Sequence, residues 1–272
     1  MKKSILFIFT ACFLFTTSCS DFLDEEHKTK YSSEYVFGTP EGLKLAVNAL
    51  YALQRYYAND TENATIFALE RGTDLAVTNG GTGNFYGIYD PNYLKPSASQ
   101  VGFMWRTMYQ IIGKANEIIA AAEDLEDTPS LRATVSEAKC FRAQSYFLLY
   151  RTFDRIWLNI QPTTAENVND PRDFHAASEK EVFDLIYEDL EYAITNLDWV
   201  SDEAGRFTQA AARHMKAKAA LWLKDWDTTL EQVEEIEKSG HFDLIALNEV
   251  FNARDLNHKE ALMVQQWSKN PG

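Results

Sequence analysis

The chain reads SLRATVSEAKCFRAQSYFLLYRTF from Ser130 to Phe153. Apolar and small side chains recur in it every three or four positions: Ala138, Phe141, Ser145, Leu148 and Leu149. That spacing places them on one face of an α-helix. Pro129 stands just before the stretch, where a proline in the first helical turn costs no backbone hydrogen bond. The stretch therefore predicts a long helix with one buried face.

The same periodicity predicts five further helices, at residues 40–58, 100–123, 178–197, 207–224 and 226–238. Start signals support two of them. Thr39 precedes Pro40 as an N-cap, and Ser178 with Glu181 forms a capping box. Gly240 is a stop signal after the last helix. The predicted fold class is all-α, with one short strand at Ala261–Gln266.

The helices follow one another as antiparallel pairs, 100–123 with 130–153 and 178–197 with 207–224. Small residues in the second member of each pair permit close helix packing: Ala138, Ala143, Ala211, Ala217 and Ala220. We expect three large aromatic residues to fill the remaining gaps: Phe141, Tyr146 and Trp222. The arrangement resembles tetratricopeptide (TPR) helical hairpins, in irregular pairs separated by long loops.

The N-terminus has the order of a secretion signal: two lysines, an apolar stretch from Ile5 to Phe15, small residues, then Cys19. The apolar stretch is shorter than the roughly 20 residues that span a bilayer. A cysteine after small residues resembles a bacterial lipobox, although Thr16 stands where leucine is usual. This implies a signal peptide at 1–18 and lipidation of Cys19. The alternative is an ordinary secreted protein with an accidental cysteine.

Residues 19–38 read as an acidic tether, and 39–272 as the helical domain. The tether opens with Ser-Asp-Phe-Leu-Asp-Glu-Glu at 20–26. An acidic stretch in this place resembles the surface-export signal of Bacteroidetes lipoproteins. A solvated spacer is the alternative interpretation, and the two are compatible.

Residues 72–99 interrupt the helical pattern with repeated glycine and proline, which predicts a long loop. Loops of this length in compact domains are usually functional or disordered. Four aromatic residues lie within it: Phe85, Tyr86, Tyr89 and Tyr93.

Composition and missing motifs exclude several function classes. A formal charge of −14 disfavours binding to nucleic acid or to anionic lipid headgroups. No motif for a metal, a nucleotide or a nucleophilic serine is present, and Cys140 stands alone once the leader is removed. Most carboxylates fall on polar helix faces. We therefore expect no catalytic residues, no metal site, no cofactor and no enzyme activity.

Several segments together resemble the SusD/RagB family of outer-membrane lipoproteins. The mature start from Cys19 to Asp24 is one, and the Trp105-x3-Tyr109-x2-Ile112-x3-Asn116 pattern is a second. Phe141-Arg142-Ala143-x2-Tyr146-Phe147-x-Leu149 is a third, and the stretch from Gly205 to Trp226 is a fourth. The order of these segments makes the resemblance fairly specific. After the helix that carries the third segment, the family usually has Phe, then Gly, a small apolar residue and Pro. Here Asp154 follows Phe153, so we expect that turn to differ.

The resemblance implies a lipid-anchored, surface-exposed protein of the outer membrane. It would capture oligosaccharide or polysaccharide and pass it to a SusC-like TonB-dependent transporter. Sugar rings stack on aromatic planes while amides and charged groups bind hydroxyls. The candidate glycan-binding residues are Asn84, Tyr86, Tyr89 and Tyr93, with Arg71 and Asp74 at the base of the loop.

Two alternatives to this interpretation stay open. The tyrosines could merely pin the loop to the helices. The protein could also be a TPR-like scaffold that docks to the transporter and hardly contacts glycan. Family members usually run about twice this length, so we expect the helical domain to be incomplete at its C-terminus, which favours the scaffold.

Overall fold

In the computed structural model, residues 31–59, 99–153, 155–170, 174–250 and 257–265 are described. Within these ranges the chain forms eight helices: α2 (Ser33–Gly38), α3 (Pro40–Asn59), α5 (Ser99–Ala122), α6 (Pro129–Thr152), α7 (Glu179–Asn196), α8 (Gln209–Trp222), α9 (Trp226–Lys238) and α10 (Leu247–Val250). The all-α prediction is confirmed, and the six predicted helices all form.

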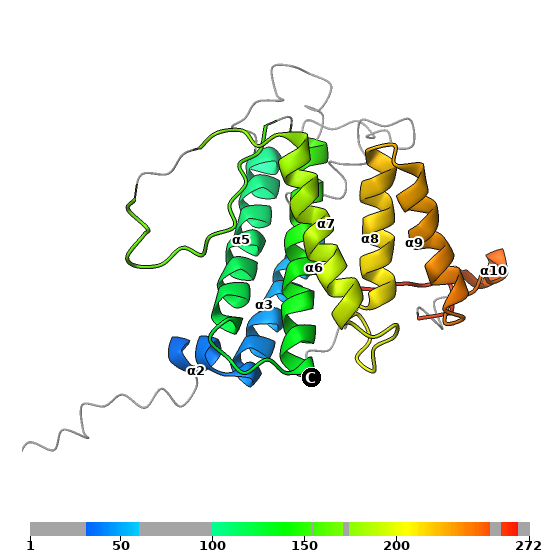
Figure 1. Cartoon of the computed structure of the whole chain (residues 1–272), viewed down its shortest axis with the longest axis horizontal. Coiled ribbons are helices and arrows are strands. Elements are labelled where there is room, and N and C mark those ends of the chain that lie inside the picture. The colour runs from blue at the N-terminus through cyan, green and yellow to red at the C-terminus, as the bar shows by residue number, and fades with distance from the viewer. Residues whose placement is uncertain (1–30, 60–98, 154, 171–173, 251–256, 266–272) are drawn as a thin grey trace, which may run out of the picture.

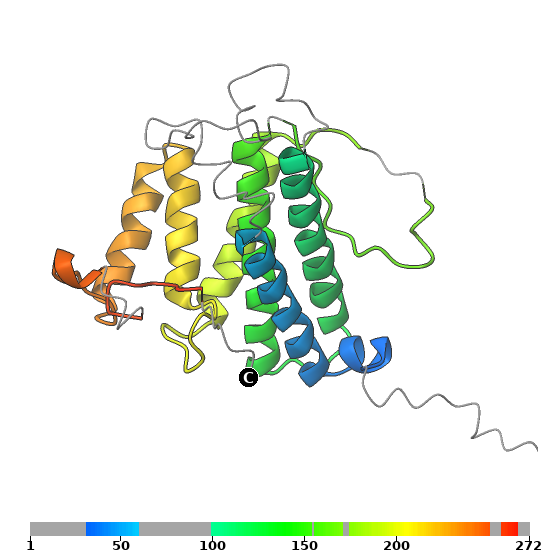
Figure 2. The same ribbon diagram turned by 180° about the vertical axis from the view of Figure 1, so that it is seen from behind.

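The long helices pack as successive antiparallel neighbours (Figure 1). Helix α6 is central, because it contacts α5, α7, α3 and α8. Helix α3 covers the face of the α5–α6 pair that is turned to the viewer in Figure 2, and α7 covers α6 on the face seen in Figure 1. Helices α8 and α9 form the last pair. This arrangement confirms the irregular TPR-like pairing.

Small side chains let these helices approach one another. The five alanines predicted at close-packing positions are all buried: Ala138, Ala143, Ala211, Ala217 and Ala220. Phe141 and Tyr146 fill the core as predicted. The prediction for Trp222 is wrong, because this residue ends α8 and remains 48% exposed, with its ring edge toward Phe147.

Hydrogen-bonding side chains fix the helix starts. Thr128 accepts from the backbone N–H of Leu131 at the start of α6. Ser178 and Glu181 make both hydrogen bonds of the predicted capping box before α7. Thr208 caps α8 by accepting from Ala211. Each cap satisfies a backbone donor that the first helical turn leaves open.

Helix α2 lies within the segment that we predicted to be a tether. Ser32 caps it, and α2 packs against α3 and α5. A glycine makes this packing possible, because a Cβ at Gly42 would lie 2.2 Å from the carbonyl oxygen of Tyr35. A helix of six residues is too short to show clear periodicity, so tertiary contacts rather than sequence pattern determine it.

The predicted strand at Ala261–Gln266 is wrong for its described residues, 261–265, which form bends and irregular backbone. The described residues near this stretch form no β-ladder with it. The N–H of Asp243 donates to the carbonyl of Lys259, and the N–H of Ala261 donates locally to the carbonyl of His258. An isolated apolar stretch without a partner strand does not become a strand. Among the described helices, none has the length and apolar character needed to cross a membrane.

Candidate functional site

The sequence-predicted site residues lie outside the described part of the chain. They are Cys19 of the lipobox and the glycan candidates Arg71, Asp74, Asn84, Tyr86, Tyr89 and Tyr93. The described residues that flank the glycan candidates are Asn59, at the end of α3, and Ser99, at the start of α5. Helix α3 runs toward the end of the bundle at which α5 begins, α6 ends and α7 begins (Figures 1 and 2). We call this the loop end of the bundle.

A row of aromatic side chains lies near the loop end: Phe153, Trp105, Tyr109, Trp157 and Phe174. The ring centroids of Trp105 lie 5.1 Å from Phe153 and 4.8 Å from Tyr109. Trp157 stacks on Tyr109, with ring centroids 6.2 Å apart, and lies tilted against Phe174, at 4.8 Å. Phe174 ends the row and is 70% exposed. The row places apolar ring surface beside the start of α5.

Two tyrosine hydroxyls hold the chain that leaves α6. The Tyr109 hydroxyl donates to the Trp157 carbonyl (2.7 Å) and accepts from the Trp157 N–H (2.9 Å). The Tyr146 hydroxyl makes the same pair of bonds with Asn159, both at 2.7 Å. Burial raises the pKa of Tyr109 to about 12, against the opposing effect of its bond to Trp157. Both hydroxyls therefore stay protonated at neutral pH and can donate.

The bonds from Tyr109 and Tyr146 to residues 157 and 159 form a tyrosine clamp. A buried ionic cluster is connected to this clamp. The Asp189 carboxylate accepts from Lys139 Nζ (2.9 Å) and from Arg142 Nε (2.8 Å) and Nη2 (2.7 Å). Arg142 also donates to Asn116, whose amide in turn donates to the Asn159 carbonyl at 2.8 Å. Burial alone would lower the pKa of Arg142, but Asp189 raises it above its usual value. Arg142 therefore stays charged, and the cluster connects α6 and α7 to the segment that the two tyrosines hold.

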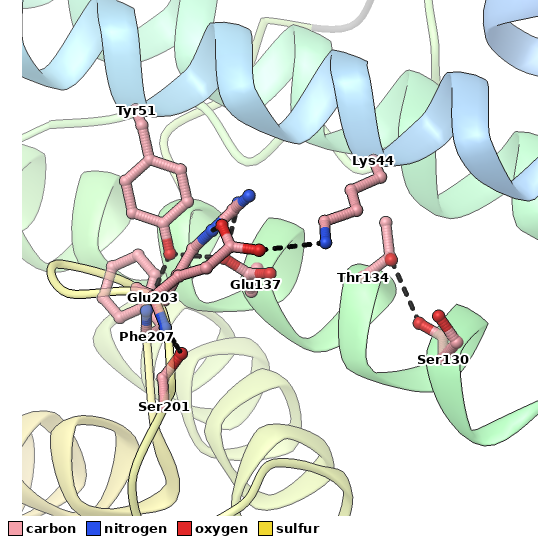
Figure 3. A network of polar contacts seen from close by, with 9 residues as sticks. Lys44, Tyr51, Ser130, Thr134, Glu137, Ser201, Glu203 and Phe207 are labelled. Carbon is pink, nitrogen blue, oxygen red and sulfur yellow. Dashed lines mark hydrogen bonds and ion pairs between the residues drawn. The ribbon is translucent and has the colours of Figure 1, made fainter.

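A second polar network lies toward the other end of the bundle (Figure 3). The Tyr51 hydroxyl donates to Glu137 and accepts from the Phe207 N–H at 2.7 Å. Arg206 links Glu137 (3.3 Å) to Glu203 (2.9 Å). Burial raises the pKa of Glu137, although Tyr51 and Arg206 act in the opposite direction. The network joins α3 and α6 to the α7–α8 loop, so we assign it a structural role.

The described residues offer stacking and hydrogen bonding rather than reactive chemistry. No group of three or more potential metal ligands lies together in the described ranges. Cys140 is a free, fully buried thiol whose pKa is raised by burial, which makes it a poor nucleophile. Five helix carboxylates were expected on solvated faces: Glu188, Glu191, Glu231, Glu234 and Glu235. The first four are exposed and Glu235 is half-buried. An aromatic row beside polar groups is an arrangement that suits sugar rings.

Residues 21–221 match a SusD-like family that is described as "Starch-binding associating with outer membrane". The chain belongs to this SusD-like family. A SusD-like protein from Bacteroides ovatus is 25% identical over 292 residues, which cover 98% of this chain and 50% of that protein. SusD-like protein P38 from Formosa agariphila is 27% identical over 252 residues, which cover 90% of this chain and 48% of the relative. The SusD-like chain thus spans about half the length of the curated relatives it matches.

Solved structures of SusD-like proteins share the fold. A SusD superfamily protein from Bacteroides vulgatus superposes with a TM-score of 0.71 at 17% identity, over 84% of this chain and 50% of that one. A laminarin-binding SusD-like protein gives 0.66 at 24% identity, over 75% and 46%. A structure with xylogluco-oligosaccharide gives 0.65 at 22% identity, over 83% and 46%. At these identities the similarity establishes the fold.

Sequence analysis missed the α6–α7 connection as part of the site. Tyr109 and Asn116 fit a family pattern, and Tyr146 was predicted to fill the core, yet all three also bind the backbone of residues 157 and 159. The available signal was polar residues at core positions of two predicted helices, because buried hydroxyls and amides require partners.

Proposed function

We propose that the protein is a non-catalytic, surface-exposed lipoprotein of the outer membrane that binds glycan. It passes oligosaccharide or polysaccharide to a SusC-like TonB-dependent transporter, and Cys19 carries the lipid anchor. The observation that carries the proposal is the match of residues 21–221 to a starch-binding family associated with the outer membrane. The relatives whose names state a ligand bind laminarin or hold xylogluco-oligosaccharide.

The local geometry supports a glycan surface at the loop end. The segment with the candidate tyrosines joins α5 at Ser99, six residues before Trp105 of the aromatic row. Stacking of a sugar ring on an aromatic plane needs such rigid apolar surface, and edge hydroxyls need amides or charges. Tyr86, Tyr89 and Tyr93 with Asn84 supply both kinds of group in one segment. Arg71 and Asp74 are the weaker candidates at its base.

Isothermal titration calorimetry with laminarin, xyloglucan oligosaccharide and starch tests the proposal. The triple variant Tyr86→Ala, Tyr89→Ala, Tyr93→Ala should bind at least about tenfold more weakly, because each lost aromatic contact removes about 0.5–1.5 kcal/mol. Tyr31→Ala is the control, since Tyr31 is exposed and stacks only on Tyr35 among the described rings. Unchanged affinity in the triple variant contradicts the site. Release of shorter sugars by the purified protein contradicts a non-catalytic role.

A second candidate function is docking of the helical scaffold to the transporter. One stripe of α9 supports it. The helical pattern of residues 226–238 is carried by four apolar residues: Trp226, Leu230, Val233 and Ile236. Ile236 is buried, as is Gln232, but the other three are exposed. Among the described helices, α9 packs against α8. An exposed apolar stripe on a helix suits a protein partner.

Co-purification with the transporter separates the two functions. Trp226→Ser with Leu230→Ser should reduce recovery of the transporter while glycan affinity stays unchanged. Glu237→Gln, an exposed substitution on the same helix, is the control. If the serine variant still recovers the transporter in full, α9 is not the docking surface.

A further inference from the structure

The backbone of Ile156–Gln161 is hydrogen-bonded on its inner side in the pattern of a β-strand. Side chains make these bonds, where a sheet would have a neighbouring strand. In an extended chain, successive residues direct their N–H and C=O groups to opposite edges. Trp157 and Asn159 direct theirs inward, where the hydroxyls of Tyr109 and Tyr146 both donate to and accept from them. The two tyrosines thus supply the alternating bonds that a neighbouring strand would make.

The opposite edge of the segment is open. It starts with one backbone bond inside the protein, from the Ala177 N–H to the Ile156 carbonyl at 2.9 Å. The next residues on that edge are Leu158 and Ile160. Within the described part of the chain, their N–H and C=O groups make no hydrogen bond. Ile160 is 51% exposed and Leu158 is half-buried, so the edge is most exposed at Ile160.

The composition of the segment leaves the edge unprotected. Proteins usually block an exposed edge with charged side chains, proline, a bulge or a covering element. Residues 156–161 read Ile-Trp-Leu-Asn-Ile-Gln, without a charge, a proline or a glycine. Phe174, which lies against Trp157, adds exposed apolar surface beside the edge. The edge is therefore both rigid and competent to pair.

We propose that Ile156–Gln161 is a preformed edge that accepts one extended polypeptide strand from a partner protein. The strand would extend the Ile156–Ala177 backbone pair by bonding to Leu158 and Ile160. A polypeptide fits better than a sugar, because the open groups repeat every two residues, roughly 7 Å, which is the repeat of a β-strand. Main-chain bonds would supply the affinity, and apolar side chains of the strand would pack beside Ile160 and Phe174. The inference does not depend on glycan binding.

Residue-resolved amide hydrogen exchange on the whole protein tests the proposal. The probe is a blocked peptide of four Thr-Val repeats at millimolar concentration. In the free protein the amides of Trp157 and Asn159 should exchange slowly, and those of Leu158 and Ile160 fast. With peptide, only Leu158 and Ile160 should slow, by about tenfold or more. Fast exchange that peptide leaves unchanged overturns the proposal, and so does slow exchange of these two amides without peptide.

A proline variant separates backbone pairing from side-chain contact. Ile160→Pro deletes the outward N–H of residue 160, because proline has no backbone N–H. It should abolish the peptide effect without lowering the melting temperature, whereas Ile160→Val should keep the effect. Equal peptide binding by both variants contradicts strand pairing. If laminarin oligosaccharide slows Leu158 and Ile160 and the peptide does not, the edge is a glycan contact and the proposal fails.

Discussion

Replacing Asp189 by alanine should remove a large share of the stability of the helical bundle. The Asp189 carboxylate is fully buried and is the only carboxylate that Lys139 and Arg142 contact among the described ion pairs of the cluster. The side chains of Lys139 and Arg142 are 11% and 6% exposed, so water would reach them poorly once the carboxylate is gone. Breaking a buried pair from one side costs about 3–5 kcal/mol, because it leaves an uncompensated charge.

That loss is large compared with the total stability of a domain, about 5–15 kcal/mol. For a domain of this size it corresponds to a fall in melting temperature of about 6–20 °C. Urea denaturation followed by circular dichroism measures the free energy directly. Asp184→Ala on the same helix is the matched control, since its pair with Lys180 is exposed and worth about 0–1 kcal/mol. If the two variants lose equal stability, the reasoning from burial is wrong.

Three further predictions concern the clamp and the anchor. Tyr146→Phe should lower the free energy of unfolding by about 1–3 kcal/mol, because the N–H and C=O of Asn159 lose their hydrogen-bond partner. An unchanged midpoint in urea denaturation would show that water replaces the hydroxyl. Burial raises the pKa of Tyr109 to about 12, so the protonated hydroxyl stabilises the fold fully below pH 10. The free energy of unfolding should fall as pH rises from 10 toward 12. Tyr109→Phe should make this fall less steep, and an identical slope would contradict the raised pKa. Cys19→Ala should release the protein from the membrane fraction or leave an uncleaved precursor, and normal retention would contradict the lipoprotein prediction.

Sequence periodicity predicted the helices well because their signals are local. The capping box at Ser178 and the proline behind Thr128 position α7 and α6 within one residue of the predicted boundaries. Which face of a helix becomes buried depends less on local sequence signals. Helical spacing places four apolar residues in one pattern on α9: Trp226, Leu230, Val233 and Ile236. Only Ile236 of these four is buried, because burial also requires a neighbouring element and the described fold has none over the other three.

The buried ion pairs and hydrogen bonds could not be predicted from the sequence, for a different reason. Arg142 and Asp189 are 47 residues apart, and only the packing of α6 against α7 brings their charges together. Likewise, nothing in the pattern around Tyr109 shows that its hydroxyl binds a segment 48 residues later. The candidate glycan residues differ again: the prediction rests on composition and resemblance, and it awaits the binding experiment.

The charged cluster raises the question of why the core holds ions at all, since apolar residues of similar volume are often equally stable. Asn116 suggests the answer. Its amide must point at the carbonyl of Asn159, and the bond from Arg142 to its oxygen fixes that orientation. The triple variant Lys139→Met, Arg142→Met, Asp189→Leu should therefore recover most of the stability that Asp189→Ala loses, yet release the 157–161 backbone. Amide exchange at Asn159 should become faster while the urea midpoint stays near wild type. Unchanged exchange at Asn159 would mean that Tyr146 alone positions the segment and that the ions serve only packing.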